Sequence, residues 1–498
     1  CVGQYDVPSS ETMVNLGVGQ PDNRKLPLDL IKNSMRKFLD EENNPEVLQY
    51  GDIPGYQRFR EKLANWLTKK SYSDIDETMF PGNITEDELF ITNGVTQALH
   101  LIMAAYMYQD DTIFVEDPTY FIMINIFNDF GLDVVPIPME PDGIDLEKLE
   151  ERLETLTKIQ ERVFLYTIPI NHNPTGITMS HEKRLLLASL CDSYSNFYVL
   201  SDEVYHFLTW EKLSKDEQVL PLADYHPNIV SIGSFSKILA PSLRLGWIYT
   251  NRKFDQNQDK NLIKILCESS FYDSTGGTAV LSSYIAESMI DDGSLDEYIE
   301  TCKSFLSSRC KSICDVLQPY KDQEIIDFEE PIGGYFLWLK TNKINASELL
   351  NFSIKNKVKF HPGWKFTSNK ENFNDRIRLS FSFYNEEDLK IGSERLMTTI
   401  LNFEKTKVAV LGSTGKLGSL IVEEVLKNQD LDYIGNINRD IDISFLPQNN
   451  CVIIDVSTPE ATNNLVKKLI SLDLKIPLII GTTGELDMSL IKNYSNNV

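Results

Sequence analysis

Short apolar segments alternate with longer amphipathic segments over the first 400 residues. The short segments hold four to six residues, are often β-branched, and resemble strands that are buried on both faces of a sheet. We predict strands at Leu89–Thr92, Thr112–Val115, Val163–Ile168, Phe197–Ser201, Ile229–Ile232 and Leu245–Thr250. Helical patterns lie between them, for example at Tyr56–Lys69, Thr96–Tyr108 and Glu182–Tyr194. The alternation predicts a layered α/β domain with a mainly parallel sheet.

A second series of the same kind begins near residue 405. Strands are predicted at Lys407–Leu411, Leu431–Ile437, Val452–Asp455 and Pro477–Ile480, and a helix at Lys416–Asn428. Such a βαβ series is typical of a dinucleotide-binding, Rossmann-like domain, here a partial one. We therefore expect one domain over 1–403 and a second over 405–498. Within the first, a large domain is expected over about 45–285 and a small domain from 1–40 and 290–403.

The composition is that of a globular protein, because 42% of the residues are hydrophobic and 24% are charged. A net charge of −25 argues against binding to nucleic acid or to an anionic membrane surface. No apolar stretch approaches the roughly 20 residues that span a bilayer. Seven cysteines without a CxxC pair, and six scattered histidines, predict no metal site and a reducing compartment. We expect a cytoplasmic protein, with organelle targeting left open because the chain begins at Cys1.

The most informative segment contains Lys237. This lysine follows a predicted strand, stands beside the hydroxyl residues Ser234 and Ser236, and is followed seven residues later by Arg244. A lysine that is removed from water has a lowered pKa and acts as a nucleophile or a Schiff-base amine. An arginine fork matches a phosphate group. The alternative is a solvated lysine in a serine-rich loop.

Other polar residues follow predicted strands in the same way. Asp202 ends the strand before Tyr205, and Asn173 opens an Asn-Pro-Thr-Gly turn. Gly94 separates a strand from a helix start whose free backbone amides suit an anion, and Tyr120 follows the next strand. In open α/β sheets, ligands bind at the carboxyl ends of the strands, so these side chains are predicted to meet there.

Together these motifs resemble those of the fold-type I aminotransferases, which use pyridoxal 5′-phosphate. The resemblance covers about residues 10–403. Its most specific parts are NPTG at 173–176, SDEVY at 201–205 and SFSK followed by Arg244 at 234–244. It implies a large domain with a mainly parallel sheet and a small domain, and the activity of a transferase of nitrogenous groups.

The resemblance also implies roles for single residues. Lys237 would carry the cofactor and then act as the general base, and Asp202 would keep the pyridine nitrogen protonated, so that the ring accepts electrons. Asn173 and Tyr205 would bind the 3′-oxygen of the cofactor, and Tyr120 would stack on its ring. The cofactor phosphate would be bound by Val95, Thr96, Ser234, Ser236 and Arg244.

Substrate and subunit contacts are implied in the same way. Arg378, directly before Leu-Ser-Phe, resembles the arginine that grips the substrate α-carboxylate in a bidentate pair. Asn173 and Gly19 would also contact the substrate, and the loop around Gly19 resembles the aminoadipate and kynurenine aminotransferase branch. Arg24 is either a reader of a distal carboxylate or a solvated arginine. Tyr50 resembles the tyrosine that reaches the phosphate in a partner subunit, which implies a homodimer.

The second series resembles the N-terminal half of dihydrodipicolinate reductase, a nicotinamide-dependent enzyme of lysine biosynthesis. The likeness rests on the glycine-rich turn after the first strand and on two later loops that follow strands. Its candidate dinucleotide-binding residues are Gly412, Gly415, Gly418, Arg439, Gly481, Thr482 and Thr483. Arg439, next to Asn438 where an acidic residue is expected, favours NADP(H) over NAD(H). The catalytic half of that family is absent, so no reductase activity is expected from this chain.

The sequence therefore predicts a homodimeric aminotransferase that exchanges an amino group between amino acids and 2-oxo acids by a ping-pong mechanism. Two alternatives stay open. One is a carbon–sulfur β-lyase that uses the same cofactor and site. The other is a ligand-sensing, non-catalytic domain of aminotransferase type. The preferred amino donor cannot be predicted from these motifs.

Overall fold

A computed structural model gives the fold of the chain, which divides into two compact units, Cys1–Met397 and Thr398–Val498. The structure describes residues 7, 9–41, 43, 45–72, 82–211, 220–250, 262–275, 277–342, 344–403, 406–428, 430–437, 440–446 and 451–496. The division between the units falls in the last turns of helix α12 (Glu386–Asn402). The boundary predicted at 403–405 stays a prediction.

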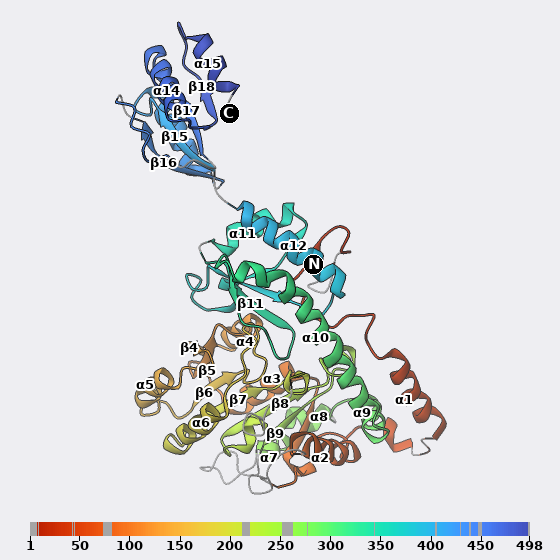
Figure 1. Ribbon diagram of the computed structural model, residues 1–498. Coiled ribbons are helices and arrows are strands. Elements are labelled where there is room, and N and C mark those ends of the chain that lie inside the picture. The colour runs from red at the N-terminus through yellow and green to blue at the C-terminus, as the bar shows by residue number, and fades with distance from the viewer. Residues whose placement is uncertain are drawn as a thin grey trace. The chain divides into compact units, whose positions relative to one another are not determined.

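The first unit is built on an eight-stranded sheet (Figure 1). In spatial order its strands are β2 (Leu89–Thr92), β9 (Gly246–Thr250), β8 (Ile229–Ser234), β7 (Phe197–Asp202), β6 (Val163–Thr167), β3 (Thr112–Asp117), β4 (Asp133–Glu140) and β5 (Gly143–Ile144). The strands from β8 to β4 are parallel, while β9 is antiparallel to both of its neighbours. The six strands predicted from the sequence are confirmed, and so is the mainly parallel sheet.

Helices cover both faces of this sheet. One face packs on α3 (Val95–Tyr106), α4 (Phe121–Asp129) and α7 (Leu262–Cys267), and the other on α5 (Leu146–Leu156) and α6 (His181–Ser193). The remaining helices of this part are α2 (Gln57–Tyr72), α8 (Ser270–Thr275) and α9 (Val280–Asp291). Because both faces are covered, the strands read as continuous apolar runs in the sequence.

A smaller layer combines residues from both ends of the first unit. Its sheet has the order β10 (Asp327–Phe328), β11 (Phe336–Lys340), β14 (Arg376–Ser380) and β13 (His361–Pro362), and α11 (Ala346–Lys355) and α12 lie near it (Figure 1). The N-terminal strand β1 (Val14–Asn15) pairs with β12 (Val358–Lys359). The long helix α10 (Ser294–Lys321) precedes this layer, and α1 (Leu28–Glu41) packs against α9. The pairing of β1 with β12 brings the N-terminal loop to Arg378.

The second unit has a four-stranded parallel sheet. Its order is β16 (Leu431–Ile437), β15 (Thr406–Leu411), β17 (Cys451–Asp455) and β18 (Leu478–Ile480). The helices are α13 (Lys416–Lys427), α14 (Pro459–Ser471) and α15 (Met488–Ser495). The four predicted strands and the predicted helix are confirmed. The first strand of the series, β15, lies between the second and the third, an order that is found in doubly wound parallel sheets.

Some elements escaped prediction. Strand β4 contains Pro136 and Pro138, and proline inside a segment argues against a strand because it cannot donate to the ladder. The strand is tolerated because only a two-residue strand, β5, pairs with its other side.

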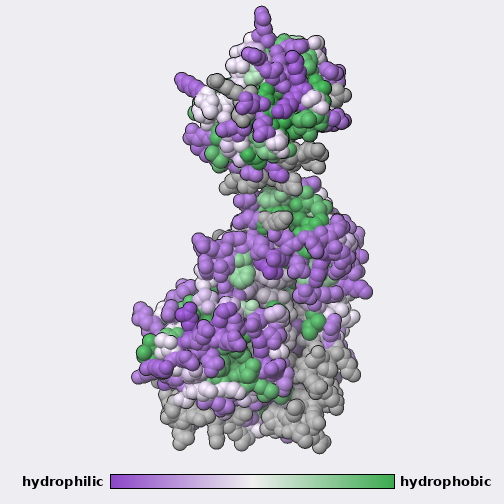
Figure 2. Space-filling view, turned by 60° about the vertical axis from the view of Figure 1, so that its left-hand side comes forward, coloured by the Kyte–Doolittle hydropathy of each residue, from purple (hydrophilic) through white to green (hydrophobic). Residues whose placement is uncertain are grey.

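In the part of the chain that the structure describes, no helix has the length and apolar character to cross a bilayer. Figure 2 shows hydrophilic residues over much of the visible face, in keeping with the net charge of −25.

Candidate active site

The predicted site residues gather at one edge of the large sheet. Strands β3, β6, β7 and β8 are parallel neighbours, so their carboxyl ends lie at the same edge. Tyr120, Asn173, Asp202 and Ser234 stand at or just beyond these four ends. This is the edge at which open α/β sheets bind ligands.

Asp202 is a buried carboxylate at the end of β7. It is 5% exposed, and its Oδ2 accepts a hydrogen bond of 2.8 Å from the hydroxyl of Tyr166 on β6. Burial raises the pKa of Asp202 to about 6, against the opposing effects of the Tyr166 hydrogen bond and of nearby Lys237. At neutral pH the carboxylate is therefore mostly ionised, and it can pair with a cationic group placed at the strand end.

Lys237 follows β8 and points into the same region. Its Nζ donates a hydrogen bond of 2.9 Å to the carbonyl oxygen of Gly19 and lies 5.1 Å from the centre of the Tyr335 ring. Burial and the positive charge of Arg378 together lower the pKa of Lys237 to about 8, while Asp202 opposes the shift. About a tenth of this amine is therefore neutral at pH 7, far more than for a lysine in water, and the neutral form is the one that a nucleophile or a general base requires.

Arg378 is buried on β14 and reaches the end of β6. Its Nη1 donates to Oδ1 of Asn173 over 2.9 Å, and its Nη2 donates to the carbonyl of Gly17 over 2.8 Å. The guanidinium carbon lies 4.0 Å from the centre of the Phe336 ring. Burial lowers the pKa of Arg378 to about 10, so the group stays charged at neutral pH. Its Nε is buried without a hydrogen-bond partner, so the group retains capacity for a further acceptor.

The N-terminal loop passes between these groups. The carbonyls of Gly17 and Gly19 accept hydrogen bonds from Arg378 and Lys237. A Cβ added at Gly19 would lie 3.0 Å from Cζ of Phe336, so a side chain at this position would displace that ring. Tyr205 is buried against Phe336, with ring centres 6.0 Å apart. The structure thus brings Gly19, Asn173, Tyr205 and Lys237 together around Arg378, although Gly19 and Arg378 are far apart in the sequence.

A cluster of anion-binding donors lies between β2, α3 and β8. Val95 and Thr96 are the first residues of α3, where backbone N–H groups have no partner within the helix. The hydroxyls of Ser234 and Ser236 are 3.0 Å apart, and Nη1 of Arg244 lies 3.5 Å from Oγ of Ser236. A Cβ added at Gly94, which has a φ of +92°, would lie only 2.9 Å from Nη2 of Arg244. This set of hydroxyls, amides and a guanidinium fits the phosphate of pyridoxal phosphate.

Two residues of the prediction lie apart from this group. Tyr50 is 82% exposed, so its side chain lies on the surface of this chain. Arg24 forms an ion pair with Asp22, with 2.9 Å between Nε and Oδ1, and Asp22 also binds the buried Arg309. The guanidinium group of Arg24 already donates hydrogen bonds to the buried carboxylate of Asp22. The structure therefore does not favour Arg24 as the residue that binds a distal carboxylate of the substrate.

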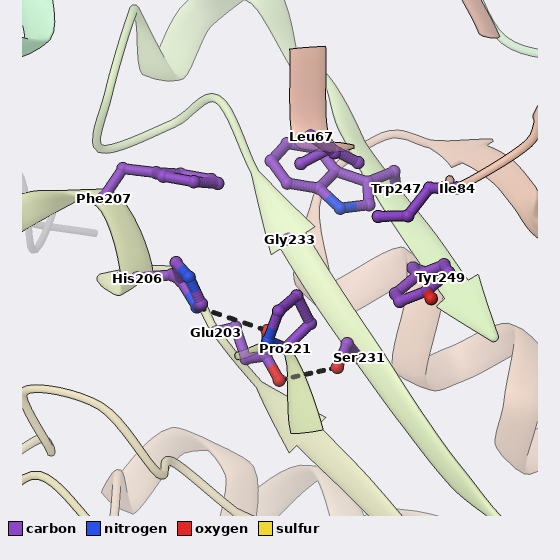
Figure 3. A pocket seen from close by; sticks show the side chains of 10 residues that line it. All are labelled: Leu67, Ile84, Glu203, His206, Phe207, Pro221, Ser231, Gly233, Trp247 and Tyr249. Carbon is purple, nitrogen blue, oxygen red and sulfur yellow. Dashed lines mark hydrogen bonds and ion pairs between the residues drawn. The ribbon is translucent and has the colours of Figure 1, made fainter. Parts of the chain in front are cut away.

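Glu203, which follows Asp202 in the sequence, is one of the residues that line a small cavity (Figure 3). The Glu203 carboxylate accepts hydrogen bonds from the hydroxyls of Ser201 and Ser231 and from the backbone amide of Leu222. His206 lies nearby, with 3.6 Å between its Nδ1 and Oε2 of Glu203. The cavity measures about 20 Å³, which is room for a single water molecule. Glu203 therefore connects β7 to β8 directly after Asp202.

The sequence analysis missed two supports of the site. Tyr166 binds Asp202, and the carboxylate of Glu116 lies 3.1 Å from Nε2 of His172, which precedes Asn173. Glu116 also accepts from the hydroxyl of Thr167 and the amide of Ile168. Tyr166 lies in a predicted strand and Glu116 directly follows one. A polar residue at such a position is the only signal that the sequence offered.

In the second unit, the predicted dinucleotide residues that the structure describes lie in and directly after the turn that follows β15 and in the loop that follows β18. Gly412 and Gly415 lead from β15 into α13, and a Cβ added at Gly418 would lie 2.1 Å from the Gly412 carbonyl oxygen. Gly481, Thr482 and Thr483 follow β18, and the Thr482 hydroxyl donates to the buried Asp455 over 3.1 Å. Arg439 and Asn438 lie outside the described residues.

Comparison with known proteins agrees with this geometry. The family described as aminotransferase class I and II matches residues 11–396, and the family described as dihydrodipicolinate reductase, N-terminus, matches residues 406–498. Aromatic-amino-acid aminotransferase 1 of Thermococcus litoralis is 29% identical over 393 residues, covering 78% of this chain and 88% of that protein.

Two further proteins similar to this chain are a solved aminotransferase and a transcriptional regulator. A solved kynurenine aminotransferase of Pyrococcus horikoshii, in complex with PMP, is 27% identical with a TM-score of 0.67, covering 80% of this chain and 95% of that one. The HTH-type transcriptional regulator YdfD of Bacillus subtilis is 25% identical over 385 residues, covering 77% of this chain and 73% of that protein. With a family match over most of its length, the chain belongs to the class I and II aminotransferases, pyridoxal-phosphate-dependent enzymes of fold type I, and it carries a C-terminal domain like the N-terminal part of dihydrodipicolinate reductase.

Proposed function

We propose that this chain transfers the amino group of an amino acid, aromatic amino acids included, to a 2-oxo acid in a ping-pong cycle. The observation that carries the proposal is the Lys237 amine. Its pKa is lowered to about 8, and it stands in the electrostatic field of both Asp202 and Arg378. The names of the Thermococcus and Pyrococcus relatives support aromatic substrates, as do the aromatic rings of Tyr120, Tyr335 and Phe336 around the site.

Pyridoxal 5′-phosphate, when bound, supplies an electron sink for the carbanion that forms at the substrate Cα. Binding of the cofactor and transfer of the proton depend on side chains of this chain. Lys237 would hold the cofactor and would act as the general base toward the proton at the substrate Cα. Asp202, which accepts a hydrogen bond from Tyr166, would keep the pyridine nitrogen protonated. Tyr205 and Asn173 would bind the 3′-oxygen, and Tyr120 would stack on the ring.

Substrate is held by its α-carboxylate in this proposal. Arg378 exchanges its hydrogen bonds to Asn173 and the Gly17 carbonyl for a bidentate pair with the carboxylate. Gly19 leaves room for the substrate, since any side chain there would push against Phe336. The phosphate of the cofactor is bound by Val95, Thr96, Ser234, Ser236 and Arg244. Because Lys237 and Arg378 are both desolvated, their electrostatic contacts with substrate are stronger than contacts in water.

The test is a panel of amino donors supplied with 2-oxoglutarate. Purified protein is expected to be yellow and to lose its cofactor absorbance band when a good donor is added without acceptor. Addition of the oxo acid should restore the band, because the cycle has two half-reactions. A protein that binds the cofactor but shows no donor-dependent change would contradict the proposal.

Arg378→Ala should lower kcat/KM for amino-acid substrates by roughly 100-fold, mainly through KM, because a buried charge pair with the α-carboxylate is lost. Tyrosine and tyramine make a matched pair, since tyramine lacks only that carboxylate. Half-reaction rates with tyramine should change much less. The control is Arg376→Ala on the same strand. A loss confined to one side-chain type would show that Arg378 reads the distal group.

We propose that the active enzyme is a homodimer in which Tyr50 binds the cofactor phosphate of the partner subunit. The exposure of Tyr50, at 82%, supports this proposal because a large aromatic side chain on the surface is available for an interface. Sedimentation of the holoenzyme tests the oligomeric state. Mixing Lys237→Ala with Tyr50→Phe protein tests the sharing of sites, because one functional site per mixed dimer would be restored.

Two other functions are tested by the same assays. A carbon–sulfur β-lyase would release pyruvate from a cysteine conjugate without any amino acceptor. A ligand-sensing domain would bind the cofactor and amino acids without turnover, and the regulator name of the Bacillus relative favours this candidate. The full set of Lys237, Asp202 and Arg378 supports turnover instead.

For the second unit we propose weak binding of NADP(H) or NAD(H) and no reductase turnover. The support is the glycine-rich turn at Gly412, Gly415 and Gly418, which opens α13 and presents backbone amides to a pyrophosphate. Arg439 favours NADP(H), and the loop from Gly481 to Thr483 would lie at the nicotinamide end. Calorimetric titration with each nucleotide measures this binding.

A chain that ends at residue 406 should keep transamination activity within about twofold of the full chain. The physical reason is that the proposed site residues all lie in the first unit, whose sheet has its own core. Activity and thermal unfolding of the shortened chain check this. A folded but inactive product would show that the second unit contributes to the active site.

A further inference from the structure

A group of positive charges stands next to Arg378 on the segment from β12 to the short helical turn Gly363–Phe366. His361 on β13 is the cross-strand partner of Arg378, so the two side chains lie on the same face of the sheet. The His361 ring also approaches the N-terminal loop, because a Cβ added at Gly17 would lie 3.2 Å from its Cδ2. Gly17 is the residue whose carbonyl binds Arg378. His361 thus borders the proposed α-carboxylate site.

Lys365 extends this group. Its Nζ lies 3.4 Å from Nδ1 of His361, and its side chain is half-buried. Burial lowers the pKa of Lys365, and the charges of Lys359 and Arg378 lower it further. Burial and the positive charges of Arg378, Lys365 and Lys359 lower the pKa of His361 strongly, so the imidazole ring is neutral. Among the residues that the structure describes, the charged groups that shift the pKa of Lys365 are therefore positive.

This arrangement is unusual in a chain with 73 acidic and 48 basic residues. Lys183, which is buried, pairs with both Glu140 and Asp142. Within the described part of the chain, Lys365 makes no ion pair with a carboxylate, and its hydrogen-bond partner is an imidazole nitrogen. A half-buried ammonium group beside two other cations has lost part of its hydration, so an anion that comes to it is favourable. An anionic group of the substrate is such a partner.

We propose that Lys365, with His361 beside it, binds the second carboxylate of a dicarboxylic substrate whose α-carboxylate is bound by Arg378. The inference rests on the proposed aminotransferase function and deepens it. A dicarboxylic amino acid or 2-oxo acid would then be one substrate pair of the enzyme. Arg24 is not assigned this role, because its guanidinium group already donates hydrogen bonds to Asp22. The neutral His361 ring keeps Lys365 in place through its Nδ1 acceptor.

The experiment compares two acceptors with one aromatic amino donor, using the full holoenzyme. The acceptors are 2-oxoglutarate, which has a second carboxylate, and 2-oxopentanoate, which has a methyl group there. Lys365→Met removes the charge and keeps the length of the side chain. It should lower kcat/KM for 2-oxoglutarate by roughly 10- to 100-fold, the usual effect of losing a hydrogen bond to a charged group. For 2-oxopentanoate the change should stay within about threefold.

Further variants separate specificity from folding. Lys365→Arg keeps a positive charge and should retain most of the preference for 2-oxoglutarate. Lys311→Met, at an exposed lysine of α10, is the matched control and should change neither acceptor. Titration with glutarate and with pentanoate gives a readout without turnover, and Lys365→Met should weaken only glutarate binding.

Each outcome decides the question. Equal losses for both acceptors, or no loss for either, would overturn the role of Lys365 while leaving the aminotransferase function standing. If the unmodified enzyme turned over neither acceptor with any donor, the proposed function itself would fail, and this inference would fail with it.

Discussion

Lys237→Ala is expected to abolish transamination, with a loss of more than about 10⁴-fold, because one side chain serves both as the cofactor-bearing nucleophile and as the general base. The structure places no other lysine at this position, between the carbonyl of Gly19 and the ring of Tyr335, among the residues it describes. Burial holds the pKa of Lys237 near 8, which suits both tasks at neutral pH. Borohydride reduction followed by peptide mass spectrometry should find the cofactor on Lys237 in the unmodified protein and nowhere in the variant.

Two controls keep this result interpretable. Thermal unfolding should show that Lys237→Ala is folded, since in the described part of the chain Nζ of Lys237 makes one hydrogen bond to a backbone carbonyl and no ion pair. Added primary amines should restore part of the proton-transfer rate, because a small amine can take the place of the missing base. A covalent adduct that persists in the variant would mean that another amine carries the cofactor.

The strands and the motifs of the first unit were predictable because each is a local pattern. An apolar run such as Val163–Ile168 signals a buried strand, and a polar residue directly after it signals the edge where ligands bind. Lys237, Asp202 and Asn173 were identified as candidates in this way. The same rule failed for β4, because its two prolines argue against a strand. The sheet tolerates these prolines because β4 lies near its edge.

Contacts between distant segments were not predictable, because they depend on strand register and on the packing of the two sheets. Arg378 and Asn173 are 205 residues apart and form a direct hydrogen bond. Tyr166 could not be assigned to Asp202, since a shift of register by one residue would turn it to the other face. Arg24 was ambiguous for the same reason, as its partner Asp22 is held by Arg309 from a helix far along the chain. The subsite at Lys365 depends on the pairing of β13 with β14 and left no motif in the sequence.

The network behind Asp202 explains why this residue can hold a charge in a buried place. The Tyr166 hydroxyl donates to one carboxylate oxygen, and the backbone amide of Val204 approaches the other at 3.4 Å. Even so, burial keeps the pKa of Asp202 near 6, so the carboxylate is less stable as an anion than one in water. A cation at the strand end would stabilise the anion further. The pyridine nitrogen of the cofactor, once protonated, is such a cation in the proposed function.

Asp202→Asn should therefore lower the transamination rate by about 10³-fold or more while leaving substantial cofactor binding, because charge stabilisation of this kind is worth several kcal/mol in a desolvated site. The amide is nearly isosteric, so the phosphate contacts are unchanged, and loss of the carboxylate lowers the pKa of Lys237 further. Single-turnover measurements of the donor half-reaction give the rate, and the absorbance band gives the bound cofactor. Asp224→Asn is the matched control, since Asp224 is also buried and held by two tyrosine hydroxyls, and the same burial raises its pKa to about 7. The Asp224 variant should lose stability and keep its rate. Near-normal turnover in Asp202→Asn would show that the pyridine nitrogen needs no charged partner in this enzyme.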